Sequence, residues 1–465
     1  MKTVIGTDKI AVANRQQEPF TRVAPVLKVA LWMGAGGGFL FATIIGLVRA
    51  FSVPAGMWED AFVQAHGHLQ VYGWAGLFVL GVALHFLPRL RGTPLYAPQL
   101  VPWFLVAQTL ALLLRALGQP LLVMTNADLW RGVLIASGLL ECGALLGLTL
   151  LLTLTALRGP ALSTRPAFVS VLPFVVAAFC SLVLAAVVNL FNMFQAAYGN
   201  GLVPGTGDTL STTLGLFGFL VMMVLAMSAR SLPMYAGLEA FPTRSLWPLA
   251  ASYILGLLLL CVNILPGGVP FLSAAGMFLP GAVLLIFVGV FLRLMRSRGR
   301  LPKKVANLAR EPQSVARAYV AQVGKERGAY GPFVALVASS YLWALLAGVL
   351  LIGNALALLV GMKQPFALDA IRHSLAVGFI ALLISGVAPR MLPGFSAGKI
   401  ASAKLVSATF WLGNSAALFR VTSALLAPLI NYSLSSILLG LSGSLGLVFA
   451  FCLLVNLWPA LGPRR

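Results

Sequence analysis

Charged residues are scarce in this chain, and acidic residues are the scarcest of them. Only 9% of the 465 residues are charged, with 11 Asp and Glu against 32 Lys and Arg, whereas 60% are hydrophobic. A soluble fold of this length would need far more polar surface to face water. The composition therefore predicts an all-α polytopic membrane protein whose immediate partner is the lipid bilayer.

Cysteine and histidine are also rare, with four residues of each kind. The cysteines lie inside apolar runs, at spacings unlike any thiolate metal site, so neither disulfides nor iron–sulfur clusters are expected. The net charge of +21 comes from short segments between apolar runs and not from one basic face. This distribution is typical of a membrane topology signal and argues against nucleic-acid binding.

Apolar stretches of about 20 residues that end in Pro, Gly or charge predict twelve membrane spans. Lys and Arg are concentrated in the loops after even-numbered spans, so the positive-inside rule predicts that both termini are cytoplasmic. We expect a cytoplasmic N-terminal tail (1–25), one transmembrane domain (26–458) interrupted by a basic cytoplasmic loop (297–329), and a C-terminal tail (459–465). The predicted spans are 26–50, 62–88, 99–118, 131–157, 167–195, 209–230, 245–265, 271–296, 330–360, 368–391, 403–427 and 432–458.

An internal repeat relates the second, sixth and tenth predicted spans. In each of them a polar residue precedes a glycine by five positions, and the span ends in an arginine beside Leu-Pro. Because these spans are four helices apart, the repeat predicts three four-helix units, 26–157, 167–296 and 330–458. The anchoring residues are His68, Gly73 and Arg89; Thr213, Gly218 and Arg230; and His373, Gly378 and Arg390.

Three of the four histidines fall in one layer near the predicted outer face. His66 and His68 lie in the first two turns of the second span, and His373 lies at a similar depth in the tenth. An ionisable side chain in a membrane span is a functional hypothesis by default, with hydrogen-bonded packing as the alternative. Two imidazoles from facing helices can hold a haem iron from both sides. We predict a b-type haem between His68 and His373, which share the repeat register.

His66 and His68 cannot hold the same metal ion if the second span is a regular helix. Positions i and i+2 point about 200° apart, toward different sides. His66 therefore serves a second haem or a copper ion, or makes only a hydrogen bond. His85 follows His68 by 17 residues, close to the cytoplasmic end of the span, and is interpreted as structural.

Further polar residues extend this hypothesis. Glu141 lies about ten residues into the fourth span, near the middle of the membrane. It is either a protonated, hydrogen-bonded side chain or a proton relay. Arginines at outer helix ends are predicted to bind haem propionates, the alternative being that each extends to the membrane interface. They are Arg49, Arg115, Arg372 and Arg420.

Three segments together resemble the NnrS family, bacterial membrane proteins that contain haem and copper and are linked to nitric oxide metabolism. The segments are "HGHLQVYG" (66–73), "SARSLPMYAG" (228–237) and "RHSLAVGFIALLISGVAPRMLPGFSAG" (372–398). Leu69 stands where the family has glutamate, and Phe395 where it has histidine. The resemblance implies a bacterial inner-membrane protein that binds haem, with copper or a second haem, and acts in electron transfer or gas-ligand chemistry as an oxidoreductase on nitric oxide.

The layout also resembles the catalytic subunit of haem–copper oxidases, which has twelve spans in three four-helix arcs and haem ligands on the second and tenth. The sixth and seventh spans contain no histidine here, so the oxidase's copper ligands are missing. Two other classes stay open. One is a cofactor-free transporter, whose histidines would couple protons or pack. The other is an assembly factor that handles haem or copper transiently.

Overall fold

The computed structural model of the protein describes residues 20–265, 267–296, 298, 313–314, 325–326 and 328–462, and all regular secondary structure in these ranges is helical. Most of the predicted N-terminal tail, most of the basic loop and residues 463–465 lie outside the described residues. The first helical span begins at Phe20, so it includes residues that we had assigned to the tail.

Eleven helices in the described ranges are long and apolar enough to cross a membrane, and each overlaps one predicted span. The remaining predicted span, 403–427, is the 24-residue helix α20 (Ala403–Leu426), which is less apolar and packs against α18 (Leu368–His373) and α21 (Tyr432–Leu457). The eleven are Phe20–Ala50, Met57–Arg91, Pro98–Thr125, Asp128–Leu157, Leu172–Tyr198, Gly205–Arg230, Thr243–Ile264, Pro270–Arg296, Phe333–Leu359, Leu368–Ser396 and Tyr432–Leu461.

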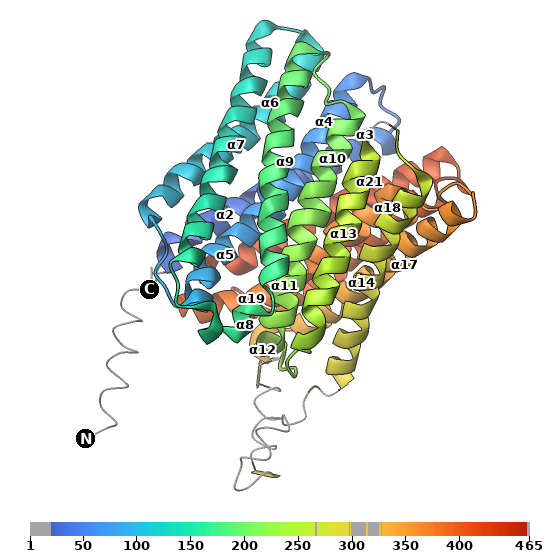
Figure 1. Cartoon of the computed structure of the whole chain (residues 1–465). Coiled ribbons are helices and arrows are strands. Elements are labelled where there is room, and N and C mark those ends of the chain that lie inside the picture. The colour runs from blue at the N-terminus through green and yellow to red at the C-terminus, as the bar shows by residue number, and fades with distance from the viewer. Residues whose placement is uncertain are drawn as a thin grey trace.

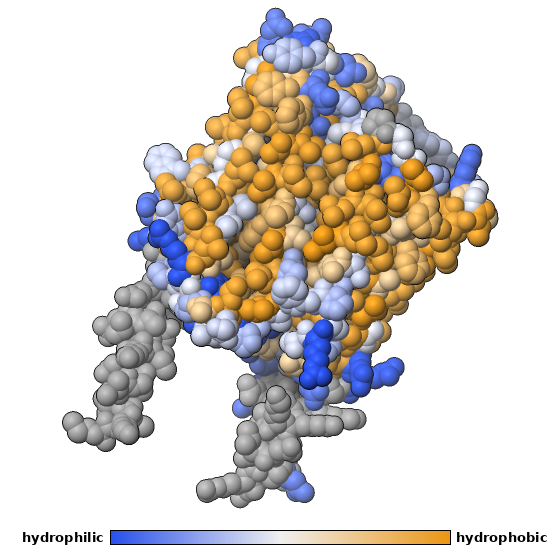
Figure 2. Space-filling view, in the orientation of Figure 1, coloured by the Kyte–Doolittle hydropathy of each residue, from blue (hydrophilic) through white to orange (hydrophobic). Residues whose placement is uncertain are grey.

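The helices run side by side in one bundle (Figure 1). The face shown in Figure 2 carries a broad apolar belt, with hydrophilic residues gathered toward its two ends. Large apolar side chains on outer helices, such as Leu150, Leu184 and Leu356, remain exposed. An apolar surface of this extent is suited to lipid and not to water, so the chain is a multi-pass membrane protein.

The second, sixth and tenth spans form the inner part of the bundle. The most apolar windows of these spans are 83%, 83% and 78% buried, against 28% to 50% for the other eight. Such extensive burial means that neighbouring helices surround these three on nearly every side. Side chains that point between them are therefore shielded from lipid.

Each inner span changes locally from an α-helix to a π-helix, and the three π-helical segments contact one another in pairs. A fourth π-helical segment, Gly34–Gly38 of the first span, packs against that of the second span. The lengths of the apolar stretches predicted helical spans and gave no sign of these π-helical segments. Local π-helical turns are rare and occur frequently at functional sites. The inner segments are Leu69–Ala75, Thr213–Val221 and Ser374–Ala381.

Glycines bring α3 (Phe39–Ala50) into backbone contact with α21. A Cβ atom at Gly443 would lie 2.7 Å from the carbonyl oxygen of Ala42, and one at Gly46 would lie 2.8 Å from that of Leu439. The hydroxyl of Thr43 donates a hydrogen bond to the carbonyl of Gly443 at 2.9 Å. This close packing closes one wall of the cavity described next.

Candidate functional site

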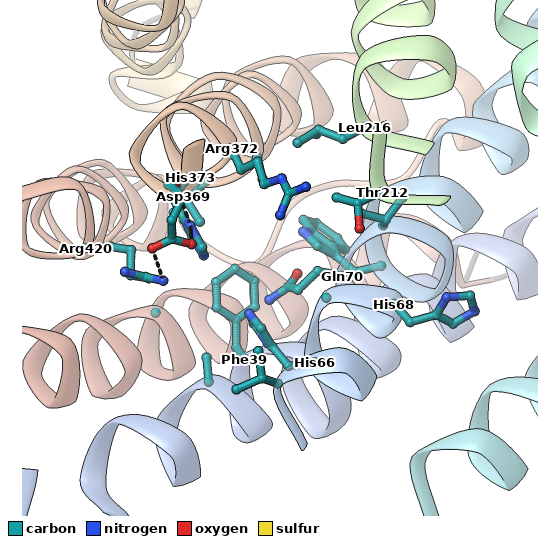
Figure 3. A pocket seen from close by; sticks show the side chains of 18 of the residues that line it. Phe39, His66, His68, Gln70, Thr212, Leu216, Asp369, Arg372, His373 and Arg420 are labelled. Atoms are coloured by element: carbon teal, nitrogen blue, oxygen red, sulfur yellow. Dashed lines mark hydrogen bonds and ion pairs between the residues drawn. The ribbon is translucent and has the colours of Figure 1, made fainter. Parts of the chain in front are cut away.

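A cavity of about 360 Å³ lies where the first, second, sixth and tenth spans meet α20 and α21. Its walls include apolar side chains such as Phe39, Ile45 and Ile380, while histidine, arginine and aspartate side chains line the rest (Figure 3). The topology predicted from the loop charges puts this cavity toward the outer face. It contains the residues that the sequence had singled out on the second and tenth spans.

His66 and His373 both point into this cavity, and each uses only one ring nitrogen in contacts with the described protein (Figure 3). The Nδ1–H of His66 donates to the carbonyl oxygen of Gly38 at 2.8 Å. The Nδ1–H of His373 donates to the backbone carbonyl of Asp369 at 2.9 Å. With the proton held on Nδ1, the lone pair of Nε2 is directed away from these acceptors and is available to a ligand in the cavity.

His68 points away from the cavity centre, although it also forms part of the wall (Figure 3). Its Nε2–H donates to both carboxylate oxygens of Glu141, at 2.8 and 2.7 Å. Its Nδ1 accepts a hydrogen bond from Nη1 of Arg115 at 2.9 Å. Both ring nitrogens are therefore hydrogen bonded, so in the second span His66, and not the predicted His68, has a free ring nitrogen beside the cavity that His373 faces.

Glu141 is the centre of a buried polar network on the far side of the second span. Its side chain is 0% exposed, and besides His68 it accepts hydrogen bonds from Gln108 at 3.2 Å and Asn189 at 2.8 Å. Arg115 donates to the side-chain oxygen of Asn189, which links the cation to the same network. The buried carboxylate is tolerated because both of its oxygens accept hydrogen bonds, and His68 and Asn189 link it to the guanidinium of Arg115.

The network joins helices α6 (Val101–Thr125), α7 (Asp128–Leu157) and α9 (Leu172–Tyr198) to the second span. These helices carry Arg115, Glu141 and Asn189 respectively. His68 and Arg115 also line the cavity, so the network borders it through these two side chains. The structure shows that Glu141 is hydrogen bonded to neighbouring helices. A protonated side chain and a proton relay both stay predictions.

The four predicted propionate-binding arginines differ in their contacts. Arg49 is paired with Glu59, Arg115 belongs to the Glu141 network, and Arg420 donates to Asp369 at 2.5 Å. Arg372 points into the cavity, and its buried Nε and Nη2 atoms have no hydrogen-bond partner in the described part of the chain (Figure 3). A buried guanidinium with unmet donors is suited to an anionic group. The geometry therefore favours Arg372 over the other three.

Asp369 is a site residue that the sequence reasoning missed. It precedes His373 by four positions in α18, and its carboxylate Oδ1 lies 3.1 Å from the Nδ1 of that histidine. Its Oδ2 forms the ion pair with Arg420. The spacing Asp-x-x-x-His places both side chains on one helix face, and that signal could have identified the contact.

Outside the cavity, the remaining histidine and the cysteines offer no comparable arrangement. His85 is buried against Phe395, with the ring centroids 4.0 Å apart, and meets the edge of Phe20. The four cysteines are free. Among the described residues, no three His, Cys, Asp or Glu side chains are grouped so as to hold a metal ion. Copper binding therefore stays a prediction without a ligand set.

Neither models of known protein families nor curated proteins give a match to this chain. What the site does chemically must be inferred from its residues.

Proposed function

We propose that the protein is a haem-binding protein of the bacterial inner membrane, with a b-type haem held in the cavity by His66 and His373. One observation carries the proposal: imidazoles on two different inner helices face one cavity with Nδ1–H engaged and Nε2 free. Histidines that bind metals commonly donate their other ring N–H to a carbonyl or carboxylate, which fixes the tautomer and the ring orientation. Both histidines have such an acceptor.

The rest of the cavity is suited to the same group. Its volume lies in the range of about 300–1,000 Å³ that is usual for cofactor and ligand sites. The apolar walls suit a porphyrin ring, and Arg372 would hold a carboxylate of the haem through charge-assisted hydrogen bonds. When bound, the haem would supply one-electron redox chemistry or would bind nitric oxide or another gas. Two histidine ligands favour electron transfer.

The repeat and the proposed topology belong to this hypothesis. Each inner π-helical segment begins at, or one residue after, the polar anchor of its repeat, His68, Thr213 or His373. This shared position supports three related four-helix units, and the likeness to haem–copper oxidases stays part of the proposal. Both termini would be cytoplasmic, with the haem near the outer face. The electron donor, a second haem and copper remain predictions.

The proposal is tested by the visible spectrum of purified protein from haem-replete cells, recorded oxidised and dithionite-reduced, with iron and copper counted by elemental analysis. We expect sharp reduced bands of a low-spin b haem, which His373→Ala abolishes or converts to a high-spin spectrum. The matched control is His85→Phe, because this histidine packs among aromatic rings outside the cavity lining. A colourless, iron-free preparation would reject the haem function.

One observation favours the cofactor-free transporter as a second hypothesis. The buried pair Glu141 and Arg115 lies inside the membrane domain, and ionisable groups at such positions often mark ion or substrate pathways. A proton-coupled transporter would purify without colour, and in proteoliposomes its transport would depend on Glu141 more than on His373. An assembly factor would differ from both by binding haem or copper substoichiometrically.

A further inference from the structure

We propose that Asp369 and Arg420 set the electron-donor strength of His373 and, through it, the redox potential of the haem. The inference rests on the proposed haem function and extends it to two residues that do not touch the haem iron. Both therefore act as positioning and tuning residues.

A chain of contacts connects the guanidinium of Arg420, through Asp369, to His373 at the cavity. Oδ2 of Asp369 accepts from Nη2 of Arg420 at 2.5 Å, and Oδ1 lies 3.1 Å from Nδ1 of His373. The backbone carbonyl of Asp369 accepts the same Nδ1–H at 2.9 Å. Arg420 comes from α20, whereas the other two residues share α18, so a separate helix supplies the charge that balances the aspartate.

His66 has a different environment. Its Nδ1–H donates to the neutral carbonyl of Gly38. No carboxylate among the described residues forms a hydrogen bond or an ion pair with its ring. The two proposed axial ligands are therefore unequal, since only His373 is backed by a carboxylate.

The physical consequence follows from the acceptor's charge. An anion 3.1 Å from Nδ1 stabilises the positive charge that the imidazole gains when it donates to iron, and so stabilises ferric iron more than ferrous iron. Hydrogen-bond partners of metal-ligating histidines typically change metal affinity or activity about 10- to 100-fold. Arg420 opposes this effect, because it withdraws charge from the same carboxylate. Reduction adds one electron to the iron, and neither residue needs to gain or lose a proton.

The test is a redox titration of the haem-loaded protein and three variants. Asp369→Asn keeps the backbone acceptor but removes the anion, so the midpoint potential should rise. Each tenfold loss of preference for ferric iron corresponds to about 59 mV for one electron. Arg420→Gln should shift the potential the opposite way. Glu59→Gln is the control, since it removes a negative charge beside Arg49 at the cavity wall without contacting either histidine.

Opposite shifts in Asp369→Asn and Arg420→Gln, with a smaller shift in Glu59→Gln, would support the inference. If the substitutions only loosened the site, the midpoint potentials of both variants would shift in the same direction, and that result would overturn the inference. Equal shifts in Asp369→Asn and in the control would also overturn it. The low-field g value of the ferric signal in electron paramagnetic resonance should change in the first two variants only.

Two further results separate the inference from the function on which it rests. If Asp369→Asn does not accumulate in cells, the inference is tested by comparing Arg420→Gln with Arg420→Lys. Only the glutamine variant should lower the midpoint potential, because lysine keeps the charge. Equal shifts in the two variants would contradict the role of charge. If the wild-type protein carries no haem, the proposed function itself fails. A haem-containing wild type with no response to these variants rejects only the tuning.

Discussion

The two histidines on opposite sides of the second span differ in their hydrogen bonding. On one side His66 faces a cavity with Nε2 free, and Arg372 presents unmet donors to the same space. On the other side the ring nitrogens of His68 and the carboxylate oxygens of Glu141 all have protein partners. Ionisable residues occur on both sides. Nε of Arg115 and Oε1 of Gln108 lack partners on the network side, among the described residues. A free imidazole nitrogen that faces the cavity therefore distinguishes the ligand site from the network.

The strongest test of this contrast exchanges nothing but the histidine. His66→Ala should abolish the low-spin haem spectrum, because an axial ligand is lost. His68→Ala should retain it, since that ring has no nitrogen available to iron in the observed arrangement. The measurement is the reduced-minus-oxidised spectrum at matched protein concentration. Loss of haem in His68→Ala alone would return the ligand role to His68 and reverse the comparison.

The network side should respond through stability instead. Glu141→Ala removes the only carboxylate that the described residues contribute to the hydrogen-bond network in which Arg115 is buried. A buried charge left without compensation costs about 3–5 kcal/mol. The apparent free energy of unfolding in detergent measures the effect. Glu59→Ala is the matched control, because Arg49 is 39% exposed and such pairs contribute about 0–1 kcal/mol. Similar losses in both variants would show that the network is not structural.

Arg372 provides a smaller effect on the cavity side. Arg372→Gln should weaken haem binding by roughly 10- to 100-fold, since a hydrogen bond to a charged group contributes about 1.5–3 kcal/mol. The spectrum of the haem that remains should stay low-spin because both histidines are intact. Lys363→Gln, an exposed cation outside the cavity lining, is the control in a haem titration of the apoprotein. Unchanged affinity in Arg372→Gln would show that the cavity's carboxylate partner lies elsewhere.

The sequence predicts the frame of this site well. Apolar runs locate the spans, and depth along them brings His66, His373 and Arg372 into one layer. The hydrogen-bond partners of these residues are harder to predict from the sequence, because they depend on which helices become neighbours. Glu141 is 73 residues from His68, and no local pattern connects the two. The repeat register favoured His68 as the ligand, whereas both ring nitrogens of His68 are hydrogen bonded to Glu141 and Arg115 and are not free to bind iron.

The Asp369–His373 contact and the π-helical segments differ in how far the sequence could have predicted them. The contact with Asp369 was predictable, since a spacing of four residues places two side chains on one face of a helix. The π-helical segments were not, because a change of one residue in the hydrogen-bond spacing leaves the apolar pattern almost unchanged. The glycine-rich run Gly34–Gly38 marks one of them. A run of glycines does not by itself identify the carbonyl that accepts the hydrogen bond from His66.

The smallest expected effect tests how that carbonyl is positioned. A Cβ atom at Gly38 would lie 2.7 Å from Cδ of Gln70, so Gly38→Ala must displace this side chain, which points into the cavity in Figure 3. Crowding of this kind typically costs about 1–3 kcal/mol, and the end of a flexible side chain should keep it near the lower limit. We expect a small loss of haem affinity and a shifted ferric g value. Gly36→Ala is the control, because its Cβ would meet only Trp32, at 3.9 Å. Equal haem affinity and equal g values in the two alanine variants would show that the first span does not orient His66. The cavity side would then tolerate small displacements that the network side does not tolerate.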